Sequence, residues 1–373
     1  MFIPPHCPNL ECRHHRNPDH AGWYRKISPY ATRTFGIVPR FLCKSCRRSF
    51  SRQTFSIHYY AKKLLDLSYI YHQINAGAGI RNISRDLQVS PRTVSNRIAR
   101  LARNAILIHQ QLVDHLPFAE DFVADGFESF CVSQYFPDNY TLLVGKDSQF
   151  VYDVHYATLR RKGRMREDQK RRRARLEKRF RPARGAIETS FRHLMRSLAR
   201  GTEARLHPLI LYTDEKKEYG RSLWKDPVSR RHLFEGRWRH HTVNSQLGRN
   251  RQNPLFAVNY MDREIRKDMA SHARESVQFA RNVNEAMLRM HLYLFDHNCR
   301  KPFRIGRSER RRHAEVAGLE RRELDRMIRG FFERRFFAHG GRLEGHSGET
   351  TLNRRWVTPL KEGQEVVRKH LAA

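Results

Sequence analysis

The chain has 373 residues, with 72 Lys and Arg against 38 Asp and Glu, which gives a formal net charge of +34. A hydrophobic fraction of 39% is sufficient for a folded core and argues against global disorder, and no apolar run is long enough to span a membrane. The positive charge favours a polyanionic partner, most commonly a nucleic acid, with an acidic membrane surface as the alternative.

The N-terminal segment MFIPPHCPNLEC lacks the charged start and apolar stretch of a secretory signal. We therefore expect a protein of the reducing cytoplasm, where cysteines bind metal ions more often than they form disulfides. Two cysteine pairs near this end have the spacings C-x4-C and C-x2-C, which suit a tetrahedral zinc site. The sequence predicts a zinc ribbon at residues 1–55 with the zinc ligands Cys7, Cys12, Cys43 and Cys46.

The wide spacing of the first pair leaves alternatives open. A nearby histidine could replace Cys12 as the fourth ligand, or the four cysteines could be unrelated free thiols. The histidines concerned are His6, His14 and His15. The remaining cysteines, Cys131 and Cys299, stand alone in the sequence, and we expect them to be small buried hydrophobic residues.

Residues 56–115 have the pattern of a helical DNA-binding domain. The stretch LLDLSYIYHQINAGAG predicts a helix that ends at Gly77 and Gly79. After the next helix, Ser90 predicts an N-cap and Pro91 the first position of a further helix. This arrangement predicts a helix-turn-helix whose second helix enters a major groove, with an ordinary basic helical hairpin as the alternative. The side chains expected on its outer, DNA-contacting side are Arg92, Thr93, Asn96, Arg97 and Arg100.

From about residue 117 the pattern changes to strands. EDFVADGFESFCV and NYTLLVGKDSQFVYDVHYATL predict three strands, and HPLILYTDEKKEY and WRHHTVNS predict two more. Between them, residues 160–205 form a basic helical segment. A long helix is expected from about Met261, with an apolar stripe that reaches Met290. The predicted phosphate contacts of the basic segment are Arg171, Arg172 and Arg173.

This order of elements is that of an RNase H-like α/β domain, which we assign to residues 116–305. Such a domain places carboxylates on its first and fourth strands and on a late helix, which here are Asp125, Asp214 and a residue of NYMDREIRKD. Mutual repulsion makes converging carboxylates costly, and divalent cations such as Mg²⁺ or Mn²⁺ relieve it. Two simpler roles remain open: an Asp-Gly turn for Asp125 and a helix N-cap for Asp214.

The zinc ribbon, the helix-turn-helix and the acidic residues, in this order, resemble a DDE-type transposase of a bacterial insertion sequence. PLFAVNYMDREIRKDMASHARESVQFARNVN and HNCRKPFRI are similar to the end of its catalytic domain, so the resemblance covers roughly residues 7–305. It implies Mg²⁺-dependent cleavage at element ends and attack of the freed 3′-hydroxyl on target DNA. It also implies Glu264 as the third acid, because that position is Glu in the family, while Asp262 and Asp268 remain alternatives.

The predicted fold is thus multidomain α/β, with a basic helical C-terminal region at residues 306–373. The expected partner is double-stranded DNA, both element ends and target, bound by a homo-oligomer associated with the nucleoid; no membrane is involved. Two other classes remain: a non-catalytic zinc-ribbon and helix-turn-helix regulator derived from a transposase, and an RNA-binding protein. The acidic triad separates the enzyme from a pure binder, which does not need it.

Overall fold

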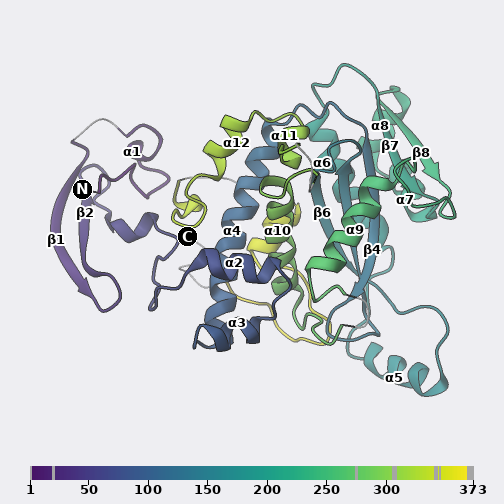
Figure 1. Cartoon of the computed structure of the whole chain (residues 1–373), viewed down its shortest axis with the longest axis horizontal. Coiled ribbons are helices and arrows are strands. Elements are labelled where there is room, and N and C mark those ends of the chain that lie inside the picture. The colour runs from purple at the N-terminus through teal and green to yellow at the C-terminus, as the bar shows by residue number, and fades with distance from the viewer. Residues whose placement is uncertain are drawn as a thin grey trace.

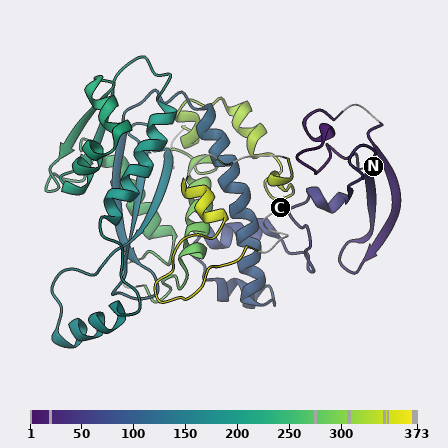
Figure 2. The same cartoon turned by 180° about the vertical axis from the view of Figure 1, so that it is seen from behind.

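Residues 2–18, 22–273, 276–304, 309–339, 343 and 346–367 are described by the structure, which is a computed structural model of the chain. A small N-terminal unit lies to one side of a larger body, in which helices surround a five-stranded sheet (Figure 1), and the view from behind shows the same separation (Figure 2). The prediction of a mixed α/β fold is confirmed at this level.

The N-terminal unit is a three-stranded antiparallel sheet around the cysteines and a few aromatic rings. Phe50 lies between Trp23 and Phe41, and its ring centroid is 5.7 Å from each of theirs. So small an apolar core usually needs a metal ion or a cross-link for stability. The elements are α1 (Arg13–Arg16), β1 (Tyr24–Thr32), β2 (Gly36–Cys43), β3 (Ser49–Ser51) and the 3-10 helix η1 (Arg52–Phe55).

Three helices follow, and the last begins where the sequence predicts. The Ser90 hydroxyl accepts a hydrogen bond from the backbone N–H of Thr93 at 3.3 Å, and Pro91 occupies the first helical position. A short turn separates this helix from the one before it, as in a helix-turn-helix. The helices are α2 (Leu67–Asn75), α3 (Ile80–Asp86) and α4 (Pro91–His115).

The second half of α4 belongs to the main body, where it runs beside α10 (Val283–Cys299) (Figure 1). The His109 ring hydrogen-bonds the carbonyl of Val151 at 2.8 Å, and the Asn104 amide donates to the carbonyl of Phe331 at 3.0 Å. One hydrophobic cluster includes residues from the predicted helix-turn-helix, catalytic and C-terminal regions. These three regions therefore share a core.

The five-stranded sheet contains all five strands that the sequence predicts. Its order is β6-β5-β4-β7-β8. β5 is antiparallel to both of its neighbours, β7 is parallel to β4, and β8 is parallel to β7. The strands are β4 (Phe122–Phe130), β5 (Pro137–Gly145), β6 (Val151–Thr158), β7 (Leu209–Asp214) and β8 (Trp238–Val243).

The remaining helices cover the sheet or pack around α4. α6 contacts β5 and β6, α9 contacts β4 and β5, and α5 projects away from the body (Figure 1). Among the described residues, no helix is long and apolar enough to cross a membrane. The elements are α5 (Glu167–Glu177), α6 (Ala186–Gly201), α7 (Lys217–Lys225), α8 (Pro227–Phe234), α9 (Phe256–Asp268), α11 (His313–Val316), α12 (Arg321–Ile328), η2 (Phe336–His339) and α13 (His346–Leu352).

The prediction of one long helix from about Met261 is wrong, because two helices cover this region. α9 ends at Asp268, and the next helix begins only after Asn282, whose side-chain oxygen accepts the backbone N–H of Glu285 at 3.0 Å. This N-cap starts a new helix, so the apolar stripe ran across two helices and a connecting segment. Met269 and His272 in the connecting segment are buried as well, so the buried positions continue where the helix does not.

The C-terminal region is less helical than predicted. In ERRELDRMIRGFFERRFF, the α-helix covers only Arg321–Ile328, and the chain turns at Gly330, whose φ of +80° lies in the left-handed region. The burial predicted for Cys131 and Cys299 is confirmed, since neither side chain is exposed.

Candidate metal cluster and active site

The four N-terminal cysteines form one cluster. Their sulfur atoms all lie within 4.8 Å of one another, and they are the one such group of His, Cys, Asp or Glu ligand atoms in the described part of the chain. The Sγ atoms of Cys7 and Cys46 are 3.5 Å apart, and those of Cys12 and Cys43 are 3.8 Å apart. Zinc–sulfur bonds of about 2.3 Å in a tetrahedron require sulfurs about 3.8 Å apart. The cluster therefore fits a structural zinc ion.

Cys12, and not a histidine, completes this cluster. The ring nitrogens of His6 and His15 lie 3.0 Å and 2.7 Å from the carbonyl oxygen of Cys7, so both rings are engaged by the backbone. The His14 ring stacks on Trp23. The geometry of the four sulfurs also argues against the alternative of unrelated thiols.

Asp125 and Asp214 point to the same face of the five-stranded sheet. On β4, Val123 and Phe127 pack against the cluster under α9, and side chains two residues apart share a face. On β7, Tyr212 packs against that same cluster, so Asp214 faces α9 as well. The parallel register pairs Val123 with Tyr212, and its continuation by two residues brings the two aspartates level.

Asp125 is held by two hydrogen bonds at this position. Its Oδ1 accepts the backbone N–H of Gly126 at 2.7 Å and the hydroxyl of Tyr219 at 3.0 Å. Burial, followed by the charge of Asp214, raises the pKa of Asp125 to about 6. Burial and the aspartates also raise the pKa of Tyr219, so its hydroxyl stays protonated and acts as the donor.

Asp262 is the acid of α9 that faces Asp125. Its Oδ1 is buried and has no hydrogen-bond partner. Burial, followed by the charge of Asp125, raises the pKa of Asp262 to about 8. An orphaned carboxylate oxygen next to a second buried carboxylate is an arrangement that a divalent cation would relieve.

Glu264, predicted as the third acid, does not have this environment. Its carboxylate pairs with Lys267 at 2.7 Å and with Lys301 at 3.7 Å. Asp268 pairs with Lys301 and accepts the Tyr293 hydroxyl. Lysines thus neutralise two of the three carboxylates of α9, and Asp262 is the one that they leave unpaired.

Asp214 is not the helix N-cap that the sequence left open, because α7 has Lys216 at that position and no side-chain cap hydrogen bond. Its Oδ1 accepts the backbone N–H of Lys216 at 3.0 Å, just before α7. The ammonium of Lys216 lies 5.5 Å from the centre of the Tyr219 ring, and its charge lowers the pKa of Asp125 against the larger effects of burial and Asp214. A cation therefore stands beside the acids.

A basic cleft adjoins the acids at Lys216. It encloses about 670 Å³ between the segments that follow β6 and precede α6. Glu128 and Glu218 are the carboxylates among its described lining residues. Six cationic residues line it, an excess that suits a phosphate backbone. They are Arg160, Arg161, Lys162, Arg181, Arg184 and Lys216.

Two of the predicted DNA-reading arginines are not on the outer side of α4. Arg97 and Arg100 are only 4% and 6% exposed, and they donate to the carbonyls of Lys63 and Ile57 at 2.8 Å and 2.6 Å. Asn96 accepts from both guanidinium groups. These side chains instead fasten the segment before α2 to the helix.

The other predicted DNA contacts differ in exposure. Arg92 is exposed at the start of α4, and Thr93 is half-buried beside Ser90. On α5, Arg171 and Arg172 are exposed, whereas Arg173 is half-buried. The guanidinium of Arg173 donates to the carbonyl of Arg161 at 2.9 Å and pairs with Glu177.

The raised pKa values predict an unusual dependence of stability on pH. Asp262 ionises near its ordinary pKa in the unfolded chain but only near pH 8 in the folded protein, so stability is lost as the pH rises between these values. We expect Asp262→Asn to raise the melting temperature of the metal-free protein at about pH 8 by a few degrees, and by less near pH 5. Calorimetry of both proteins, with Glu264→Gln as the control, measures this. An unchanged or lower melting temperature of Asp262→Asn at pH 8 contradicts it.

Tyr219 and Lys216 were not singled out from the sequence, although both follow Asp214 closely in the chain. The cleft residues Arg181 and Arg184 belong to the basic segment that the sequence predicts as a phosphate track, although the contacts named there were Arg171, Arg172 and Arg173. The chain matches no protein-family model, and a search of curated proteins finds no match either.

Proposed function

We propose that the protein is a DDE-type DNA transposase, which cleaves DNA at the ends of a mobile element and joins the strands to target DNA. The observation that carries this proposal is a pair of buried carboxyl groups: Asp125, whose pKa is raised by burial and by Asp214, and Asp262, whose pKa is raised by burial and by Asp125. Strongly perturbed pKa values in one place are typical of catalytic sites.

The topology of the sheet supports the proposal. Three antiparallel strands followed by two parallel ones, in the order β6-β5-β4-β7-β8, fit an RNase H-like domain. The acids lie on its first strand, its fourth strand and a late helix, where the resemblance expects them. The third acid is Asp262 in this proposal, which makes the triad three aspartates.

The roles of the residues follow from their surroundings. Asp125, Asp214 and Asp262 would hold Mg²⁺ or Mn²⁺, which supplies charge stabilisation of the attacking and leaving oxygens when bound. Tyr219 orients Asp125 through its hydrogen bond, and Lys216 offers a positive charge to a phosphate between the acids and the basic cleft. The four-cysteine cluster holds the ribbon together as a further DNA-binding unit.

A non-catalytic regulator is the second candidate, because the four-cysteine cluster and the α3–α4 turn serve a DNA-binding protein equally well. A regulator of this kind does not account for Asp262, whose buried carboxylate oxygen lacks a hydrogen-bond partner. The two functions differ in whether DNA strands are broken.

The test uses a plasmid that carries the gene with its genomic flanks, incubated with the full-length protein and Mg²⁺ or Mn²⁺. We expect breaks at discrete positions in the flanks and joined products, both dependent on the cation. Uncut flanks together with intact duplex binding would assign the regulator instead.

Duplex binding should depend steeply on salt through the basic cleft. Each phosphate contact contributes about 0.9 to the slope of log affinity against log salt concentration. We expect the triple change Lys162→Ala, Arg181→Ala and Arg184→Ala to reduce this slope by up to roughly 3 for all sequences alike. Fluorescence anisotropy with labelled duplexes over a salt series measures it. A larger effect of Arg171→Ala with Arg172→Ala would place the phosphate contacts on α5 instead.

A further inference from the structure

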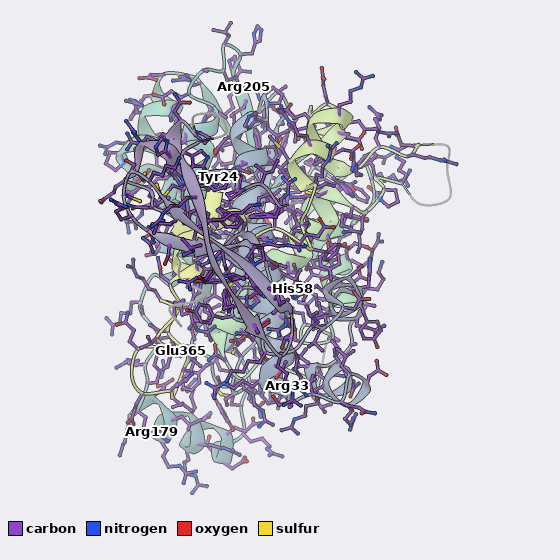
Figure 3. All side chains as sticks on the ribbon, turned by 90° about the vertical axis from the view of Figure 1, so that its left-hand side faces the viewer. Tyr24, Arg33, His58, Arg179, Arg205 and Glu365 are labelled. Carbon is purple, nitrogen blue, oxygen red and sulfur yellow. The ribbon has the colours of Figure 1, made fainter. Side chains whose placement is uncertain are left out.

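A second open groove lies in the N-terminal unit, far along the chain from the acids. It encloses about 650 Å³ between the three-stranded sheet and the segment that links η1 to α2. The hydroxyl of Thr34, in the turn between β1 and β2, donates to the carbonyl of Lys62 at 2.8 Å and ties this turn to the linking segment. In Figure 3, Tyr24 and Arg33 mark opposite ends of the β1–β2 hairpin, which crosses the front of the molecule.

Tyrosine rings line the groove and reach solvent. Tyr60 is 68% exposed and Tyr30 is 37% exposed, although both are large apolar rings. Tyr59 lies beside Tyr60, with ring centroids 4.5 Å apart. Exposed aromatic rings in a groove are the surfaces on which unpaired nucleobases stack.

Backbone irregularities set the positions of the two exposed rings. Tyr60 has a φ of +56°, a left-handed conformation that is uncommon for a bulky residue. Tyr30 directly follows an irregularity in the β1–β2 register, where the pairing shifts between Ile27 and Tyr30. Bulges redirect side chains, and residues held in strained conformations are enriched at binding sites.

The charge of the groove suits a nucleic-acid strand. Arg33, Arg40 and Lys62 line it, and no carboxylate occurs among its described lining residues. The rest of the polar lining consists of Ser and Thr hydroxyl groups and the amide of Gln53. Cationic residues along a groove follow a phosphate backbone, while the rings accept bases of any identity.

We infer that this groove binds single-stranded DNA, with bases stacked on Tyr60 and Tyr30 and phosphates paired with Arg33 and Lys62. The inference rests on the proposed function in taking DNA as the partner, and it adds that the ribbon holds unpaired strands. Duplex DNA buries its bases in the stack and offers them no access to the rings, so the groove should discriminate between the two forms.

The test measures binding of the full-length, zinc-loaded protein to fluorescent oligothymidylate and to a duplex of equal length. Tyr60→Asn removes the ring and suits the left-handed conformation, because Asn adopts it more readily than other residues. We expect this variant to lose at least about fivefold in affinity for oligothymidylate, with duplex affinity unchanged. Tyr60→Phe should bind like the wild type, because it keeps the stacking ring. Trp224→Ala, which removes an exposed ring of α7 elsewhere, is the matched control.

Unchanged oligothymidylate binding by Tyr60→Asn overturns the inference, as does an equal loss of duplex affinity. Zinc content and melting temperature, measured on the same samples, show whether a loss reflects a misfolded ribbon, and Tyr30→Ala then provides the second measurement. Tighter binding of oligouridylate than of oligothymidylate assigns the groove to RNA and overturns the choice of DNA. Plasmid cleavage is scored separately, so its absence with groove binding intact contradicts the proposed function alone.

Discussion

Asp125→Asn, Asp214→Asn and Asp262→Asn are each expected to reduce cation-dependent DNA cleavage by at least about 100-fold. Each change keeps the shape of the side chain and removes one negative charge that would hold a divalent cation. The fold should persist, because burying the charged carboxylates of Asp125 and Asp262 destabilises the folded protein, and an amide of the same shape removes that cost. Single-turnover cleavage of the flanking DNA, at saturating Mg²⁺ and with duplex binding measured in parallel, provides the comparison.

The matched controls lie on the same helix. Glu264→Gln and Asp268→Asn remove carboxylates that pair with Lys267 and Lys301, so they should keep cleavage activity and lose some stability. Loss of cleavage in Glu264→Gln with activity retained in Asp262→Asn would return the third acid to Glu264. Full cleavage activity in Asp125→Asn or Asp214→Asn would contradict the proposed enzymatic function.

The double change Cys43→Ser and Cys46→Ser is expected to abolish zinc binding and unfold the N-terminal unit. A structural zinc ion contributes about 10–16 kcal/mol to the folding of a small domain. The apolar cluster of this unit consists of a few aromatic rings and the cysteines themselves, which is too little to hold it without the ion. Metal analysis should find about one zinc per chain in the wild type and almost none in the variant.

The main body should survive this change, because its hydrophobic clusters contain no residue of the cysteine cluster. Limited proteolysis should therefore remove the N-terminal unit and leave a fragment that begins near α2. Cys131→Ala, a change of a buried cysteine outside the cluster, is the control and should keep its zinc. An unchanged zinc content in the double variant contradicts the assignment of the ligands.

Local patterns in the sequence determined much of this protein. The spacing of the cysteines predicted the cluster, and Ser90 with Pro91 predicted the start of α4, because a cap or a metal knuckle depends on residues close in the chain. The strands were readable for a similar reason: aromatic and branched residues fill their buried faces. The strand positions of Asp125 and Asp214 were predictable for that reason, since Asp125 lies within β4 and Asp214 ends β7.

Only the tertiary structure decided which partner each polar side chain finds. Asp262, Glu264 and Asp268 remained alternatives in the sequence, but Lys301, which pairs with the last two, lies just beyond the C-terminal end of α10. Arg97 was expected to face DNA, but its side chain is buried and its guanidinium donates a hydrogen bond to the carbonyl of Lys63. Long-range pairing of this kind depends on how separate elements pack, and no local pattern records it.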